Sequence, residues 1–312
     1  MKSLKFILLI LMIIFLLSCS PTEDTQEDTG DNTGDLQIFP PDNPWNTDIS
    51  TYRVHPDSDK FISSIGSGKS LHPDFGTVWN GAPNGIPYII VPGSTPMVNI
   101  IFTAYGDESD PGPYPVPDDA PVEGGNNSDG DRHVIVIDTD NKILYELYRA
   151  FKVSGGWEAE SGAKWDLTSN QMRTKYWTSA DAAGLPVFPG LVRYNEVSKG
   201  EITHALRFTV RRTQRGFIYP ARHFASNSSD PNLPPMGLRL RLKSDFDISG
   251  FSEQNQVILR ALKKYGMLVA DNGGDWFISG SPDSRWDDED LNQLKNIHGM
   301  DFEVVYTGEI EK

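Results

Sequence analysis

Tyr219, Arg222 and His223 lie within five residues of one another, at the end of an apolar run and directly before the polar segment 225–232. A strand that ends in such a loop presents its last side chains where ligands bind. On a uronate, arginine would neutralise the carboxylate, histidine or tyrosine would take the C5 proton, and a tyrosine would protonate the leaving oxygen. The three residues therefore suggest β-elimination on a polysaccharide. The alternative is an arginine paired with an acid beside a packed tyrosine.

Two further histidines lie in or beside apolar runs. His133 begins the run 133–138, and His204 comes shortly before Leu206 and Phe208. Alternation along a strand directs both side chains toward an apolar layer. Each alone is expected to be a hydrogen-bonded core residue, whereas histidines that converge in one groove would supply a general base or metal ligands. None has the local spacing of a metal site, so we expect no metal bound by histidine.

Carboxylates support a second chemistry, the hydrolysis of glycosidic bonds. This reaction requires one acid that protonates the leaving oxygen and a second carboxylate that activates water or attacks the sugar. Glu146 shares a strand face with Leu144 and Tyr148, where burial would raise its pKa and suit it to the acid role. Asp166 and Asp181 each lie near tryptophans. For all three acids the alternative is a turn, cap or ion-pair role.

Trp157, Trp165 and Trp177 fall in one stretch rich in glycine and amides, together with Asn170. Exposed indoles are good platforms for the faces of sugars, and neighbouring amides bond sugar hydroxyls. The alternative is that these tryptophans pack in the core. The pattern nominates these four residues for substrate binding.

The sequence offers little for cofactors. The Asp-rich loops 126–131 and 271–275 place several oxygens on a glycine-flexible backbone, which suits Ca²⁺, but neither matches the EF-hand pattern and plain turns are the alternative. The chain has no phosphate-binding glycine loop, dinucleotide fingerprint, His-Glu-x-x-His or Gly-x-Ser-x-Gly motif. Nucleotide-driven chemistry is therefore disfavoured, and we expect no cofactor, with Ca²⁺ as the one candidate.

Short strands divided by Gly, Pro, Asn and Asp must position these residues. The turn residues 138–141 between two β-rich runs predict a hairpin. One apolar stripe predicts a helix over 252–265, with Ser252 at its start and Gly266 after its end, and weaker patterns predict helices at 57–65 and 287–296. Strands are expected at 86–92, 97–103, 133–138, 143–151, 203–210, 215–222, 237–242, 267–271, 275–279 and 302–307.

Many short strands with few helices predict a single mainly β domain over residues 37–312, a β-sandwich, jelly roll or barrel-like fold. The long, proline-stiffened loop 105–125 lies within it. Loops of that length inside compact domains are often functional. We therefore expect this loop to contribute to function.

The chain begins with the features of a secretion signal. Lys2 and Lys5 precede an unbroken apolar run over 6–17, which is too short for a convincing membrane-spanning helix. The segment that follows, Leu16-Leu17-Ser18-Cys19, resembles the lipobox of bacterial lipoproteins. The resemblance implies that the signal peptide 1–18 is removed and that a lipid on Cys19 anchors the exported protein to the bacterial outer membrane or cell surface. The alternative is an ordinary cleaved signal.

The segment 19–36 contains six acids, no base and almost nothing apolar, which predicts a disordered, solvated tether. The formal net charge of the chain is −15, which disfavours nucleic acid and anionic lipid as partners, so we expect contact with the membrane through the lipid anchor only. Cys19 is the single cysteine, so an ordinary apolar core must hold the fold without disulfides. We expect a monomer.

Export, a β-rich scaffold and the candidate acids favour a surface lipoprotein that cuts an extracellular polysaccharide, in the first place by hydrolysis with an Asp/Glu pair. The alternatives are a polysaccharide lyase that uses Tyr, Arg and His, a non-catalytic glycan-binding lipoprotein and an envelope-assembly lipoprotein. The enzymes require a cleft with convergent polar groups, and the binding module requires a shallow aromatic face. The assembly protein requires an exposed apolar patch.

Overall fold

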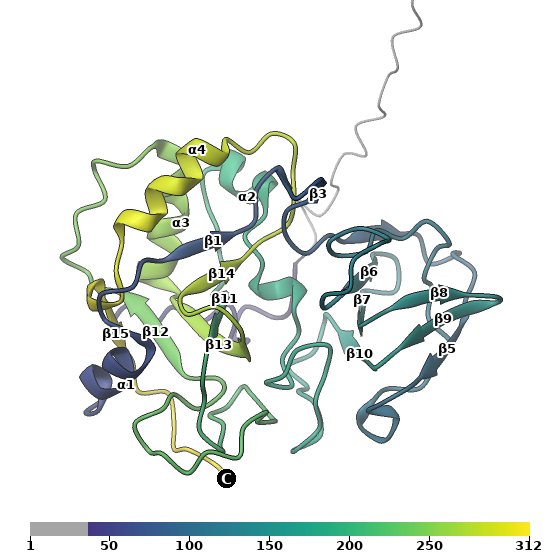
Figure 1. The fold of residues 1–312 in the computed structure, drawn as a ribbon, viewed down its shortest axis with the longest axis horizontal. Coiled ribbons are helices and arrows are strands. Elements are labelled where there is room, and N and C mark those ends of the chain that lie inside the picture. The colour runs from purple at the N-terminus through teal and green to yellow at the C-terminus, as the bar shows by residue number, and fades with distance from the viewer. Residues whose placement is uncertain (1–36) are drawn as a thin grey trace, which may run out of the picture. The chain divides into compact units, whose positions relative to one another are not determined.

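Residues 37–312 are described by a computed structural model, and their strands form four β-sheets (Figure 1). The contacts among these residues hold them together as one compact unit. The expected signal peptide 1–18, the lipid attachment at Cys19 and the tether 19–36 lie outside the described residues.

The largest sheet has six strands and mixed direction. Strand β11 lies parallel to β13 on one side and antiparallel to β14 on the other. Along the sheet the strands are ordered β1 (His72–Asp74), β14 (Phe277–Ser279), β11 (Leu206–Val210), β13 (Met267–Asn272), β12 (Arg239–Leu242) and β15 (Phe302–Val304).

Helix α3 (Glu253–Lys264) packs on this sheet and confirms the helix predicted at 252–265. The hydroxyl of Ser252 accepts a hydrogen bond from the N–H of Asn255 at 3.2 Å and so caps the first turn. The stripe of Val257, Ile258, Ala261 and Leu262 is buried, as its spacing predicts. Helix α1 (Ser58–Ile65) packs against β15 at the edge of the sheet.

The second sheet has four strands in the order β10 (Ser161–Asp166), β7 (Ile143–Tyr148), β6 (Val134–Asp138) and β4 (Ile89–Val91). Its β6–β7 pair confirms the predicted hairpin, because the carboxylate of Asp138 accepts hydrogen bonds from the backbone and side-chain N–H groups of Asn141 at 2.9 and 2.8 Å. Every residue of β6 is buried, so both faces of this sheet are covered.

The remaining elements are small. A three-stranded sheet has the order β5 (Asn99–Phe102), β9 (Gly156–Ala159) and β8 (Phe151–Val153), and a hairpin pairs β2 (Val78–Trp79) with β3 (Ala82–Pro83). The short helices are α2 (Tyr194–Lys199), α4 (Asp288–Leu291), η2 (Gly106–Glu108), η3 (Phe188–Gly190), η4 (Asn292–Asn296) and η5 (Gly299–Asp301). None of the helices in residues 37–312 has the length and apolar character needed to cross a membrane.

Side chains of the four-stranded sheet alternate between two apolar clusters. Ile135 and Ile137 point into the main core, which also contains the side chains of β11, β12 and α3. Val134 and Val136 point into a second core beneath the three-stranded sheet. The described residues are thus mainly β with few short helices, and the curled sheets are consistent with a sandwich or barrel-like domain, as the sequence predicts.

The strand expected at 215–222 is a wrong prediction. Only Phe217 of that segment makes β-bridges, to Met236 and Glu311. The N–H of Ala221 instead donates to the carbonyl of Ile218 at 3.0 Å, which closes a turn around Pro220.

A buried carboxylate joins β7 to the segment that leads into η3. Glu146 is fully buried and accepts hydrogen bonds from the N–H groups of Val187 and Phe188 at 2.9 and 2.8 Å and from the indole of Trp165 at 3.0 Å. Burial raises its pKa to about 7, although these hydrogen bonds oppose the rise. The residue satisfies three donors that no water can reach.

Glu146→Ala should lower the free energy of unfolding by about 3–5 kcal/mol, because it leaves three buried donors without an acceptor and opens a cavity. Glu146→Gln should cost less, since the amide oxygen keeps part of the acceptor role. Urea unfolding followed by circular dichroism measures both, with the exposed Asp245→Ala as control. Equal stability of Glu146→Ala and wild type would contradict this role.

Candidate functional site

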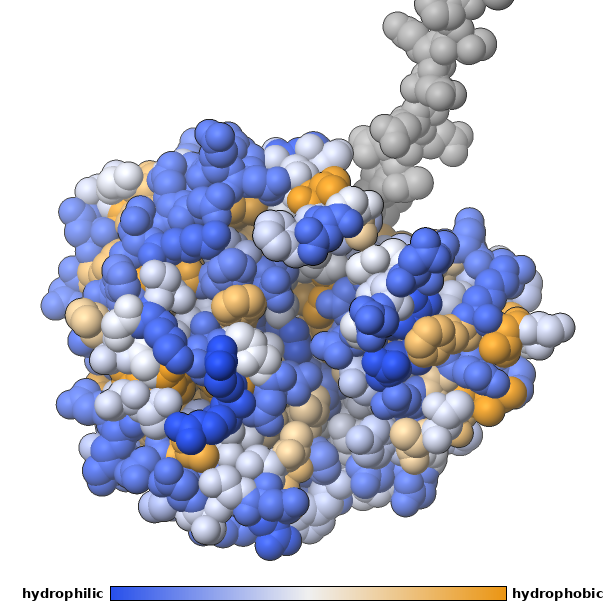
Figure 2. All heavy atoms as spheres, in the orientation of Figure 1, coloured by the Kyte–Doolittle hydropathy of each residue, from blue (hydrophilic) through white to orange (hydrophobic). Residues whose placement is uncertain are grey.

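Two cavities lie between the six-stranded sheet and the ends of β6, β7 and β10, with volumes of about 360 and 440 Å³. Asp271, at the end of β13, lines both of them, so the cavities adjoin at this residue. Figure 2 shows the surface hollowed between these two parts of the molecule. We call the two cavities together the cleft, the smaller being its first part and the larger its second.

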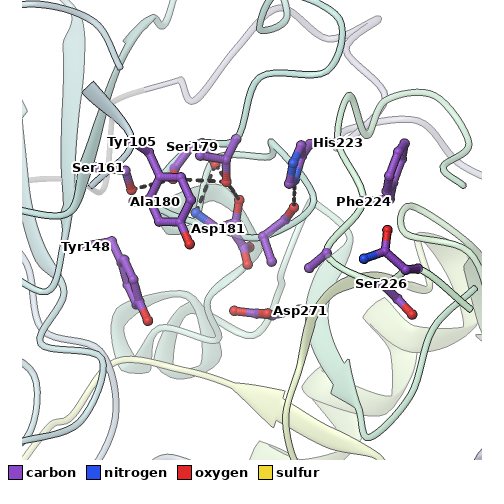
Figure 3. Close-up of a pocket in the computed structure, with 14 residues that line it drawn as sticks. Tyr105, Tyr148, Ser161, Ser179, Ala180, Asp181, His223, Phe224, Ser226 and Asp271 are labelled. Atoms are coloured by element: carbon purple, nitrogen blue, oxygen red, sulfur yellow. Dashed lines mark hydrogen bonds between the residues drawn. The ribbon is translucent and has the colours of Figure 1, made fainter. Parts of the chain in front are cut away.

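The first part of the cleft has aromatic and polar walls. Two tyrosines lie on one side of it, part of the segment after Ala221 lies on the other, and two aspartates lie between them (Figure 3). Burial raises the pKa of Tyr148 to about 12, so its hydroxyl stays protonated and can donate a hydrogen bond. The tyrosines are Tyr105 and Tyr148, the residues of the segment after Ala221 are His223, Phe224 and Ser226, and the aspartates are Asp181 and Asp271.

The second part of the cleft contains carboxylates without cationic partners. Asp74 at the end of β1, Asp131 before β6 and Asp271 line it together. Within residues 37–312 the side chains of Asp74 and Asp131 make no hydrogen bond or ion pair, and the carboxylate of Asp271 accepts one from the backbone of Asn272 at 2.6 Å. Trp79, whose surface is 66% exposed, stands at this part of the cleft.

Two of these carboxyl groups, those of Asp74 and Asp271, hold protons more tightly than free aspartate does. Burial, followed by the negative charge of Asp181, raises the pKa of Asp271 to about 7, and Asp131 adds to the effect. Asp74 is exposed, but the protein atoms around it and the charges of Glu123 and Asp131 also raise its pKa. Near neutral pH Asp271 therefore keeps its proton in a substantial fraction of the molecules.

Asp181 lines the cleft, but a buried ion pair occupies its carboxylate. Arg207 donates to both carboxylate oxygens, at 3.0 and 2.9 Å, and to the hydroxyl of Ser279 at 2.6 Å. Both charged side chains are almost fully buried. The pair fixes one wall of the cleft and leaves Arg207 without a free donor face for a ligand carboxylate.

The three predicted histidines have different surroundings. His133 is buried in the wall of the cleft, where Glu123 at 2.6 Å overcomes the effect of burial and raises the histidine pKa to about 9. Its other ring nitrogen donates to the carbonyl of Ala180 at 2.9 Å, so neither nitrogen is free to act as a base. His204 lies at a separate cavity, within 3.2 Å of Glu196.

His223 lines the first part of the cleft. Its Nδ1 atom lies 2.7 Å from the carbonyl oxygen of Ala182 and therefore carries the hydrogen in the neutral ring. Nε2 then has a free lone pair. Tyr219 and Arg222 do not line the cleft with it: Tyr219 is 45% exposed elsewhere, and Arg222 donates to the backbone carbonyl of Arg173 at 3.2 Å.

The other predicted acids lie outside the cleft. Glu146 is in the interior and lines neither part of it. Asp166 is exposed, and its carboxylate accepts hydrogen bonds from the backbone and hydroxyl of Thr168 at 2.8 and 2.6 Å, which orders a turn. The structure thus brings Asp181, His133 and His223 together at one site and separates Glu146 and Asp166 from it.

The residues nominated for sugar binding are also dispersed. Trp157 and Trp165 are buried, the former in the second core and the latter against Glu146. Asn170 donates to Asp42 at 2.9 Å and accepts from Asn43 at 3.0 Å, so its amide is engaged within the protein. Trp177 alone is half-exposed, at a pocket of its own.

Sequence reasoning missed Asp74, Trp79 and Tyr148 as site residues, but part of the site carried a signal. Asp131 and Asp271 belong to the two Asp-rich loops considered for Ca²⁺, and the long loop 105–125 supplies Tyr105 and Glu123. Over residues 37–312, no three or more His, Asp or Glu side chains form a group suited to hold a metal ion.

Comparison with known proteins finds no matching family model, no similar curated protein and no similar solved structure. The chemistry of the cleft therefore rests on its own geometry.

Asp271→Asn should stabilise the protein above pH 7 by about 2 kcal/mol relative to wild type, and should have little effect below pH 4. The folded-state pKa of about 7 exceeds the usual value of 3.8, so wild type loses stability as pH rises between these values. The amide of Asn in the variant does not titrate, so the stability of the variant does not fall for this reason over this pH range. Thermal melts between pH 4 and 8 measure the difference, with Asp245→Asn as control. A destabilised variant at pH 8 would contradict the raised pKa.

Proposed function

We propose that the protein is a glycoside hydrolase of an extracellular polysaccharide, with Asp271 as the general acid and Asp131 as the carboxylate that activates water or attacks the sugar. The observation that carries this proposal is the carboxyl group of Asp271, whose pKa is about 7, at the junction of the two parts of the cleft. A carboxylic acid that keeps its proton near neutral pH beside an ionised carboxylate is the pairing that glycosidases use.

Aromatic side chains on both sides of Asp271 support a sugar chain as substrate. Tyr105, 46% exposed, lines the first part of the cleft together with Phe224, and Trp79 lines the second part together with Phe277. Each ring offers a face on which a sugar can stack. A chain that occupies both parts would place the bond between two sugar units above Asp271.

In this mechanism Asp271 donates its proton to the glycosidic oxygen as the bond to the anomeric carbon breaks. Asp131 takes a proton from the attacking water, or attacks the anomeric carbon itself before water releases the sugar. Asp131 suits this role because it lines the same cavity and its carboxylate makes no hydrogen bond or ion pair within residues 37–312. Tyr148, with its protonated hydroxyl, is placed to donate a hydrogen bond to the sugar beside Asp271.

Elimination is the second candidate, because the free Nε2 atom of His223 and the tyrosine hydroxyls meet in the first part of the cleft. A lyase must also neutralise the carboxylate of the uronate at the cleavage point. Among residues 37–312 no lysine or arginine lines that part of the cleft, and Arg207 in the other part is bound to Asp181. Hydrolysis of a neutral unit is therefore favoured.

The test is incubation of the full chain with neutral and uronate-containing polysaccharides, following new reducing ends and absorbance near 232 nm. We expect reducing ends without the absorbance. Asp271→Asn and Asp131→Asn should each lower kcat by about 10²–10⁴-fold. The wild-type rate should fall as pH rises through 7, where Asp271 loses its proton.

The exposed Asp245→Asn serves as the matched control for charge and should retain the wild-type rate. Absorbance that rises with the reducing ends would identify a lyase and overturn hydrolysis. Binding of a glycan without cleavage would instead identify a binding module.

We also propose that the protein is a lipoprotein held at the bacterial outer membrane or cell surface through Cys19. The support is the lipobox-like Leu16-Leu17-Ser18-Cys19 after the apolar run. Wild type should incorporate labelled palmitate and sediment with membranes, whereas Cys19→Ser should do neither. Palmitate-free wild type in the culture medium would indicate an ordinary cleaved signal.

A further inference from the structure

A pocket of about 290 Å³ beside the cleft combines an aromatic ring with a lysine that forms no ion pair within residues 37–312. Trp177, Lys164 and Gln171 line it, and none of them belongs to the cleft. Two carboxylates also line it, but Asp110 is paired with Arg173 and Asp166 accepts hydrogen bonds from Thr168. We call it the Lys164 pocket.

Trp177 is held in place by a buried arginine. The guanidinium of Arg173 lies 5.6 Å from the centre of its ring. That guanidinium is itself fixed by the carboxylate of Asp110, by the carbonyl of Glu108 and, at 3.0 Å, by the carbonyl of Thr178. The indole therefore has a fixed neighbour on one side while part of its surface remains exposed at the pocket. A fixed, half-exposed indole is suited to stack on a sugar ring.

Lys164 is the unusual charge in the pocket. It is half-buried, and its ammonium lies 5.0 Å from the ring centre of Tyr114 and 6.0 Å from that of Tyr145. No carboxylate in residues 37–312 forms an ion pair with it, although the chain has 43 acidic residues and 28 lysines and arginines. Burial lowers its pKa, and Asp110 only partly opposes this. A half-buried ammonium in this setting is best stabilised by an anion from a ligand.

The Lys164 pocket and the cleft are lined by neighbouring residues of one segment. Trp177 lines the pocket, and the next residue, Thr178, lines the first part of the cleft. The N–H of Thr178 donates to the carboxylate of Glu108 at 2.8 Å, which ties this segment to the loop that carries Tyr105 into the cleft. This adjacency is the basis for considering one ligand for both places.

We propose that the Lys164 pocket binds a carboxylated sugar unit of the glycan whose neutral part occupies the cleft. The ammonium of Lys164 pairs with the sugar carboxylate, Trp177 stacks on the ring and the exposed amide of Gln171 bonds a hydroxyl. The unpaired carboxylates of the cleft disfavour a charged unit at the cleavage point. The substrate class is thus a polysaccharide with a neutral backbone that carries uronate units at intervals, and its link to the cleft rests on the proposed hydrolysis.

The test uses pairs of methyl glycosides that differ only at C6, glucuronide with glucoside and galacturonide with galactoside, titrated into the full chain and followed by NMR. Wild type should bind at least one uronide about tenfold more tightly than its neutral partner. Lys164→Met should abolish this preference, and Trp177→Ala should weaken binding of both members of the pair. Lys295→Met removes the same charge at an exposed position and should change neither.

Equal binding of charged and neutral sugars to wild type, no binding of either, or a preference that survives in Lys164→Met would each overturn the proposal. Thermal melting of Lys164→Met, with Lys164→Gln as a second variant, verifies that each variant is folded. Asp271→Asn should bind the uronide as wild type does, since Asp271 does not line the pocket. Uronide binding without cleavage of any polysaccharide would reject the proposed hydrolase and support the Lys164 pocket as a binding site. Cleavage of a polysaccharide without a Lys164-dependent preference for the uronide would reject the pocket proposal and support the hydrolase.

Discussion

The site depends on one tripeptide, Ala180-Asp181-Ala182, which three side chains hold from different directions. The carboxylate of Asp181 forms the buried bidentate pair with Arg207 of β11, while the flanking carbonyls lie 2.9 Å from His133 and 2.7 Å from His223. A buried ion pair contributes little net stability, but loss of one partner leaves the other charge buried without compensation, which destabilises the protein. The pair therefore serves to place one wall of the cleft against the six-stranded sheet.

Charges in the cleft fall into two groups with different consequences. Asp181 with Arg207, and Glu123 with His133, are compensated pairs that shape the walls. Asp74, Asp131 and Asp271 form no ion pair within residues 37–312. Burial and neighbouring negative charges raise the pKa of Asp74 and of Asp271, and the charge of Asp131 contributes to both effects. This repulsion weakens the folded state near neutral pH. Carboxylates that lower stability in this way are common at functional sites.

The sequence predicted the elements that depend on local patterns, namely helices, their caps and hairpins. The stripe of α3, its Ser252 cap and the β6–β7 hairpin follow from spacing and turn residues. The burial of Glu146 also followed from the alternation of its strand, but its partners Val187 and Phe188 lie about forty residues further along the chain. The aspartates that line the cleft are far apart in the sequence, at positions 74, 131 and 271. No local sequence pattern predicts which acids come together in the fold. The acid-rich loops contain two of the aspartates that line the cleft, Asp131 and Asp271, but suggested Ca²⁺ binding.

The main core runs without interruption beneath both walls of the cleft, because Ile135 and Ile137 of one sheet pack in the same cluster as Leu206 and Phe208 of the other. A close-packed interior of this kind transmits strain and resists bending. The two walls therefore cannot swing apart as separate bodies. On the proposed function, a polysaccharide would enter and leave through the open side of the cleft, and release of its fragments would depend on how tightly the cleft binds them, without a closing motion of the walls.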